Sequence, residues 1–209
     1  GDDDDDEEEE IEFAVPDENG AKPEKKRYGK ACVPATPNAE TSNQTLIKWL
    51  PRRRNIRELL DAVEADKTAD LVGSEPAKVL VAYQVETDVT WAGFSERVCG
   101  RTLEEAFGLE NADWCQSAAR KDVGLKLRKA PADISSLASG LHKRVAGKSF
   151  DKTRFALEVM AAVREEWVTP TYIRNGLRWL AGQVSLEIEK EAEAAVEAVE
   201  VVLAPEPAE

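Results

Sequence analysis

The chain has 209 residues, with 41 Asp or Glu against 28 Lys or Arg, and its formal net charge at pH 7 is -13. The first twelve residues carry ten acids and no base, and the residues from 187 onward carry eight Glu and one Lys, which leaves +4 for residues 13–186. A single His and three scattered Cys argue against a histidine-ligated zinc site, a Ser-His-Asp triad and a disulfide framework. Because the chain has no apolar run of about 18 residues and no secretory signal, we expect a cytoplasmic protein with no membrane partner.

Composition divides the chain into four parts. Residues 1–41 are acidic and then rich in Pro, Gly and basic residues, which predicts a disordered or irregular segment. Residues 42–130 have an α/β pattern, residues 131–190 a helical pattern, and residues 191–209 form an acidic tail rich in Ala and Glu. The expected fold class is therefore α/β, with a small parallel sheet and flanking helices, followed by a mainly helical C-terminal half.

The first ordered elements are expected from residue 42 onward. Residues 41–43 can cap a helix that ends at Trp49, before Pro51, and a second helix fits residues 55–64 with Asn55 as its cap. Residues 78–84 are apolar and β-branched, which is typical of a buried strand. Residues 89–98 fit a hairpin or a loop, and residues 121–129 fit a strand or a loop.

Helices dominate the expected second half. Thr102 can cap a helix that continues toward Cys115, and a further helix fits residues 131–145, with Gly147 as its end. Asp151 can cap a helix over residues 152–167, and Thr169 followed by proline begins the last helix. The apolar residues of that last helix expected to pack inward are Ile173, Leu177, Trp179 and Leu180.

Six short peptides follow one another between residues 29 and 182. They are GKACVP (29–34), ETSNQTLIKW (40–49), VAYQ (81–84), GRTLEEAF (100–107), FDKTRFAL (150–157) and YIRNGLRWL (172–180). In this order they resemble the C-terminal Toprim catalytic region of the overcoming-lysogenization-defect (OLD) family of nucleases. That family includes the nuclease subunits of Gabija-type antiphage systems.

The resemblance implies a metal-dependent DNA endonuclease with a Toprim-like sheet, acting in antiphage defence. Its cofactors would be two divalent ions, Mg²⁺ or Mn²⁺, which activate the attacking water and stabilise the leaving oxygen of a phosphodiester. DNA would be the partner, and the full-length protein would form a homodimer or a larger assembly. ATP would act only through an ATPase domain upstream of this chain.

The resemblance also implies roles for single residues. Lys152 matches the lysine of the family's Lys-Thr-x-Phe-Ala peptide and is the expected catalytic residue, where an ammonium can offset developing negative charge. Glu104 matches an acidic position of the metal site. Arg101 is expected to contact a DNA phosphate or to pair with Glu104. The alternative for Lys152 and Glu104 is that they are ordinary first-turn residues, solvated or favoured by the helix dipole.

The chain departs from the family at the other metal ligands. The glutamate that should follow a first strand is missing, and the Asp-x-Asp motif has only two partial matches, at Asp2 and at Asp17. The alternative for both aspartates is a disordered acidic run. We therefore expect the chain to be part of a catalytic region and inactive when alone.

Basic residues suggest a further DNA contact through counterion release. The residues expected to make it are Arg52, Arg53, Lys126 and Arg128. The alternative is a solvated charged face. The second hypothesis for the whole chain is accordingly a non-catalytic DNA-binding or protein-interaction module on a degenerate Toprim scaffold.

Overall fold

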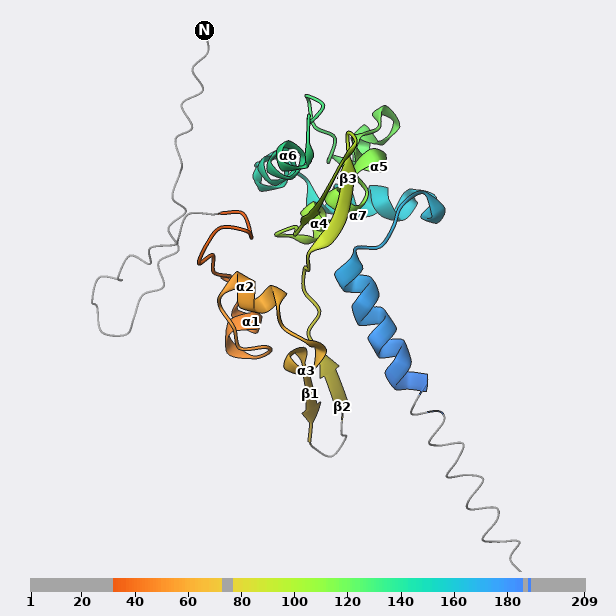
Figure 1. The fold of residues 1–209 in the computed structure, drawn as a ribbon. Helices are drawn as coiled ribbons and strands as arrows, with labels where there is room; N and C mark the ends of the chain where they lie inside the picture. The colour runs from red at the N-terminus through yellow and green to blue at the C-terminus, as the bar shows by residue number, and fades with distance from the viewer. Residues whose placement is uncertain (1–31, 73–76, 186–187, 189–209) are drawn as a thin grey trace, which may run out of the picture. The chain divides into compact units, whose positions relative to one another are not determined.

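The computed structural model describes residues 32–72, 77–185 and 188 (Figure 1). Apart from Cys32, all of them belong to one compact unit, Val33–Glu209. Of the segment expected to be disordered or irregular, residues 1–31 lie outside the described residues, as does the tail at 191–209, whereas residues 32–41 contain turns and one isolated bridge, from Glu40 to Asn55. None of the described helices is both long and apolar enough to cross a membrane.

The first helices are short and begin at the predicted asparagine caps. Helix α1 (Gln44–Lys48) follows Asn43, whose side chain accepts a hydrogen bond from the Thr45 N–H at 2.9 Å. Helix α2 (Ile56–Leu60) follows Asn55, which accepts from the Arg57 N–H at 2.9 Å. A separate one-turn helix, α3 (Glu64–Lys67), comes next, so the helix expected over residues 55–64 ends earlier, at Leu60.

Two antiparallel hairpins follow. Strand β1 (Thr68–Leu71) pairs with β2 (Ala77–Leu80), and β3 (Thr87–Trp91) pairs with β4 (Phe94–Val98), which confirms a hairpin within residues 89–98. Residues 92 and 93 both have positive φ, 51° and 82°, as a two-residue turn with the correct twist requires.

The expected small parallel sheet is wrong for the described residues, where both sheets are two-stranded and antiparallel. The reason is the length of the connections. Parallel neighbours need a crossover of about a dozen residues or more, whereas residues 72–76, 81–86 and 92–93 are the only segments between these strands. Strand β2 is also half-exposed rather than buried, and residues 81–86 that follow it have no regular structure. The described fold is thus mixed α/β with small antiparallel sheets.

Helix α4 (Leu103–Glu110) begins at its predicted cap, because the Thr102 hydroxyl accepts from the Glu105 N–H at 3.2 Å. Helix α4 ends at Asn111, which is also the N-cap of a second helix, α5 (Ala112–Gln116), and this second helix continues past Cys115. The 3-10 helix η1 (Ala118–Val123) leads into an irregular segment, so the predicted strand-or-loop at 121–129 contains no strand.

The C-terminal half is helical. Helix α6 (Ile134–Ala146) ends at Gly147 as predicted, and α7 (Lys152–Ala161) begins at its predicted cap, Asp151. Helix α7 ends earlier than expected and gives way to a short 3-10 helix, η2 (Arg164–Glu166). Residues 171–185 form the last described helix, drawn in blue in Figure 1 and called the C-terminal helix below.

Two apolar clusters have formed. The large one joins β3 and α4 to α7, and its most buried side chains are Cys115, Leu125, Ile134, Leu137 and Leu141. Within it the Phe107 ring meets three other aromatic rings, from Trp114, Phe155 and Trp167, at centroid distances of 5.8, 5.5 and 5.5 Å. The small cluster contains Leu46, Leu59 and Tyr83.

The C-terminal helix buries only part of the side predicted for it, since Ile173 and Trp179 are half-buried. Leu177 is 58% exposed and Leu180 is 53% exposed, so their expected inward packing is wrong. The helix turns Trp179, as well as Tyr172 and Gly176, toward residues 80–85. Gly176 fixes this orientation, because a Cβ added there would lie 3.1 Å from the Ala82 Cβ, and a larger residue would hold the two segments apart.

Candidate functional site around Glu104 and Lys152

The candidate site is built on the first turn of α4, where two consecutive glutamates are buried. Glu104 is 7% exposed and Glu105 is 3% exposed. The helix N-terminus favours negative charge, but a carboxylate withdrawn from water also needs specific partners. Each of the two glutamates has its own.

Glu104 is held by Lys152. The Lys152 Nζ lies 3.3 Å from Glu104 Oε1, and Lys152 is the first residue of α7, with a side chain that is 66% exposed. Burial raises the pKa of Glu104, but the hydrogen bond from its own backbone N–H, the Thr102 hydroxyl and the Lys152 ammonium outweigh burial and hold the pKa below its usual value. Glu104 is therefore ionised at neutral pH and paired with a lysine that reaches solvent.

Glu105 is held by two other residues. Its Oε2 accepts from the Arg101 backbone N–H at 3.2 Å and from the Arg101 Nε at 3.0 Å, and its Oε1 lies 2.8 Å from His142 Nδ1. Arg101 was expected to contact a DNA phosphate or to pair with Glu104, and in the structure it pairs with the neighbouring glutamate, Glu105. Glu105 and His142 were not predicted as site residues, and they are 37 positions apart, so no local pattern signals their contact.

The other end of α4 fastens the C-terminal helix. The Glu110 carboxylate accepts from the Thr171 N–H at 2.9 and 3.0 Å and from its hydroxyl at 2.7 Å. Asn111 accepts from the Val168 N–H at 2.6 Å and donates to the Val168 carbonyl at 2.9 Å. Burial, and then the Glu104 and Glu110 carboxylates, raise the pKa of Tyr172.

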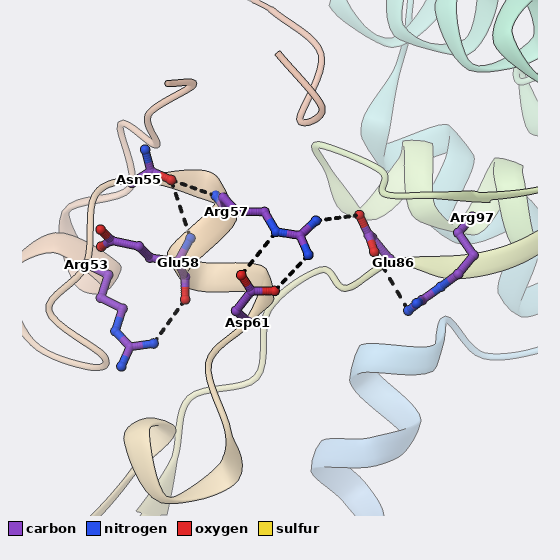
Figure 2. A network of polar contacts seen from close by, with 7 residues as sticks. All are labelled: Arg53, Asn55, Arg57, Glu58, Asp61, Glu86 and Arg97. Atoms are coloured by element: carbon purple, nitrogen blue, oxygen red, sulfur yellow. Dashed lines mark hydrogen bonds and ion pairs between the residues drawn. The ribbon is translucent and has the colours of Figure 1, made fainter. Parts of the chain in front are cut away.

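The predicted DNA contacts other than Arg101, which are Arg52, Arg53, Lys126 and Arg128, lie elsewhere. In the described part of the chain, no hydrogen bond or ion pair joins them to Glu104 or Lys152. Arg53 donates to the Glu58 carbonyl and pairs with Asp66, both at 3.0 Å. Figure 2 shows that Arg53 belongs to a surface network in which Arg57 joins Asp61 to Glu86 and Glu86 also meets Arg97. The Lys126 ammonium donates to the Gln116 carbonyl, and two further arginines are exposed, Arg52 and Arg128.

The described residues do not by themselves fit a metal centre. They contain no group of three or more His, Cys, Asp or Glu able to hold an ion. Glu104 is one carboxylate, whereas two hard cations need several oxygen ligands. The other predicted ligands, Asp2 and Asp17, lie outside the described residues.

Comparison with known proteins adds no relative: no family model matches the chain, and no curated protein or solved structure matches it. Two observations therefore bear on function, the six peptides of the sequence and the pairing of Lys152 with Glu104.

Proposed function

We propose that this chain is part of a cytoplasmic, metal-dependent DNA endonuclease of the OLD type, and that Lys152 and Glu104 share its site. One observation carries the proposal. Two residues 48 positions apart, each selected for its match to a family motif, have side-chain atoms 3.3 Å apart. Both lie in the first turn of a helix, which is where each motif would place them.

The reaction proposed is hydrolysis of a phosphodiester with Mg²⁺ or Mn²⁺. Lys152 would meet the negative charge of the phosphate, because its ammonium already reaches solvent while paired. Glu104 is held ionised, the state that a carboxylate needs in order to bind a cation. The remaining ligands must come from outside the described residues, and a Toprim-like sheet, antiphage defence and assembly into a homodimer or larger oligomer are parts of the same proposal.

A non-catalytic DNA-binding or protein-interaction module is the second candidate. It is favoured by the antiparallel sheets and by the lack of a three-ligand metal group in the described part of the chain. In that case the Lys152–Glu104 contact is a structural ion pair, which keeps a buried carboxylate from standing alone.

Nicking of supercoiled plasmid with Mg²⁺ or Mn²⁺ tests the proposal. It should be run on this chain and on any longer product of the same gene, each with and without Lys152→Ala. We expect nicking by the active form to fall by about 100-fold or more in Lys152→Ala, as for loss of one charge-stabilising donor in other enzymes. Lys78→Ala is the matched control, because Lys78 is an exposed lysine on β2, and nicking should be unchanged.

Two outcomes contradict the nuclease. Nicking that survives Lys152→Ala in full would remove Lys152 from the chemistry. If every form folds and binds DNA but none nicks it with either metal, the chain is the non-catalytic module.

A further inference from the structure

An open cavity of about 440 Å³, called the aromatic cavity below, lies between residues 80–85 and the C-terminal helix. Its volume is in the range of small-ligand pockets, about 300 to 1,000 Å³. Three aromatic side chains, two cationic ones, one carboxylate and one amide are among the residues that line it: Tyr83, Tyr172, Trp179, Lys67, Arg178, Glu64 and Asn175. This mixture offers ring faces for stacking and positive charge for an anion.

The three rings differ in their availability. Tyr83 is 8% exposed, its hydroxyl donates to the Leu59 carbonyl at 2.7 Å, and the Lys67 ammonium lies 5.0 Å from its ring centroid, so it serves as a wall. Tyr172 and Trp179 are half-buried and keep part of their surface accessible. They are seven positions apart on one helix and therefore share one of its faces.

A second cavity, of about 380 Å³, adjoins the first through a shared residue, Arg178. We call it the arginine groove, because Arg164, Arg174 and Arg178 line it over an apolar floor that includes Val168 and Leu177. Arg164 donates to the Trp167 carbonyl and the Thr169 hydroxyl, and Arg174 donates to the Thr171 hydroxyl, so their known partners are neutral oxygens.

The arginine groove has uncompensated positive charge. Within the described ranges none of its three arginines forms an ion pair, whereas several arginines outside it each pair with a carboxylate: Arg53, Arg57, Arg97, Arg120 and Arg154. An anionic ligand would therefore meet three guanidinium groups without displacing an acidic side chain. Guanidinium groups bind phosphate through paired, planar hydrogen bonds.

We propose that the C-terminal helix binds a segment of single-stranded DNA, with one unpaired base stacked on Trp179 and Tyr172 in the aromatic cavity and the adjoining phosphates on Arg178 and the arginine groove. Stacking rings beside a positive groove are how proteins hold single strands. A duplex keeps the faces of its bases inside the helix, so it cannot fill the aromatic cavity. This inference rests on the proposed function and specifies the form of the DNA. Thr171, the residue before Tyr172, binds Glu110 at the end of α4, and this contact joins the proposed binding helix to the helix that holds Glu104.

Fluorescence anisotropy with a labelled thymidine oligonucleotide of about ten nucleotides, a length within known single-strand site sizes, tests the inference. We expect Trp179→Ala to weaken binding by on the order of tenfold, because stacking contributes about 1 to 3 kcal/mol per base. Trp179→Phe should retain most of the affinity, since it keeps a ring. Arg178→Ala should weaken binding and also reduce the slope of log K against log salt by about 0.7, the value for one phosphate of a single strand.

Two controls make the test specific. Leu180→Ala alters an exposed residue of the same helix outside both cavities, and Arg97→Ala removes an arginine that already pairs with Glu86. Both should leave affinity and salt slope unchanged, and circular dichroism should show that every variant is folded. The inference is overturned if the folded wild-type chain does not bind the oligonucleotide, or if Trp179→Ala and Arg178→Ala bind it as the wild type does.

The plasmid assay separates this inference from the proposed function. If the protein binds the oligonucleotide through Trp179 but never nicks DNA, the binding site is supported and the nuclease proposal is contradicted. If the protein nicks DNA through Lys152 but has no affinity for the oligonucleotide, the nuclease proposal is supported and the binding-site inference is contradicted.

Discussion

The region from residue 33 to residue 83 and the region from residue 87 to residue 168 are held together by different forces. In the second region thirteen buried residues form one apolar cluster. In the first region only three buried residues form the apolar cluster. Asparagine caps and the exposed ion-pair network of Figure 2 add to its stability. Buried apolar area stabilises by about 25 cal/mol per Å², whereas exposed ion pairs contribute about 0 to 1 kcal/mol each. The two regions should therefore differ in local stability.

This difference bears on the candidate site. Glu104, Glu105, His142 and Lys152 lie on α4, α6 and α7, which form the large cluster. One wall of the aromatic cavity comes instead from residues 80–85, beside the small cluster. We infer that the charged groups of the candidate site are held rigidly, whereas the wall of the aromatic cavity at residues 80–85 unfolds locally at a lower free energy, since regions with few buried contacts have low local stability.

The largest expected effect comes from the large cluster. Leu141→Ala removes a side chain with no exposed surface and should lower the free energy of unfolding by about 2 to 5 kcal/mol. Leu59→Ala, in the small cluster, should mainly accelerate amide hydrogen exchange in residues 33–83. Urea unfolding and hydrogen exchange measure the two results. If both substitutions lowered the global free energy of unfolding equally, with no regional change in hydrogen exchange, the two regions would unfold as one cooperative unit.

An intermediate effect is expected from the charge on Glu104. Its folded-state pKa lies below the usual 4.5, so the ionised form is the one that stabilises the fold. That contribution is fully present above pH 4.5 and is lost as pH falls through the lowered pKa. Glu104→Gln should therefore cost about 1 to 2 kcal/mol at pH 7, and wild type and variant should converge in acid. Urea unfolding from pH 3 to pH 7 checks the sign, and a gap that widened in acid would contradict it.

The smallest effect is expected from the surface network. Arg57 contacts Asp61 and Glu86, but its side chain is 70% exposed, so solvent screens both pairs. Arg57→Ala should change the free energy of unfolding by less than about 1 kcal/mol, and 1 M salt should reduce the change further. A loss comparable to that of Leu141→Ala would mean that the ion pairs, rather than the apolar cluster, support the first region.

Features that depend on neighbouring residues could be predicted from the sequence. Asn43, Asn55, Thr102 and Asp151 are helix caps as expected, because a cap bonds only to the next two or three residues. The described strands do not form the expected parallel pairs, because a β-branched run predicts a strand but not its partner. The short connections between the strands decide the pairing.

Features set by distant residues could not be predicted locally. The C-terminal helix has two apolar sides, and the contact of Gly176 with Ala82 determines which one is buried. The Lys152–Glu104 contact joins residues 48 positions apart and was not predicted, although the family resemblance singled out each of the two residues. The His142–Glu105 contact, between α4 and α6, had no signal in the sequence at all.

Helix α4 holds Glu104 at its first turn and, at its last residue, Glu110, which anchors the C-terminal helix. At 1.5 Å per residue, the backbones of these two positions are about 9 Å apart, and an α-helix hardly stretches. If the groove on the C-terminal helix and the Lys152–Glu104 site act on the same DNA molecule, α4 works as a ruler. Cleavage would then fall at a constant offset from the bound segment, and a substrate with one short single-stranded segment would give one dominant product length.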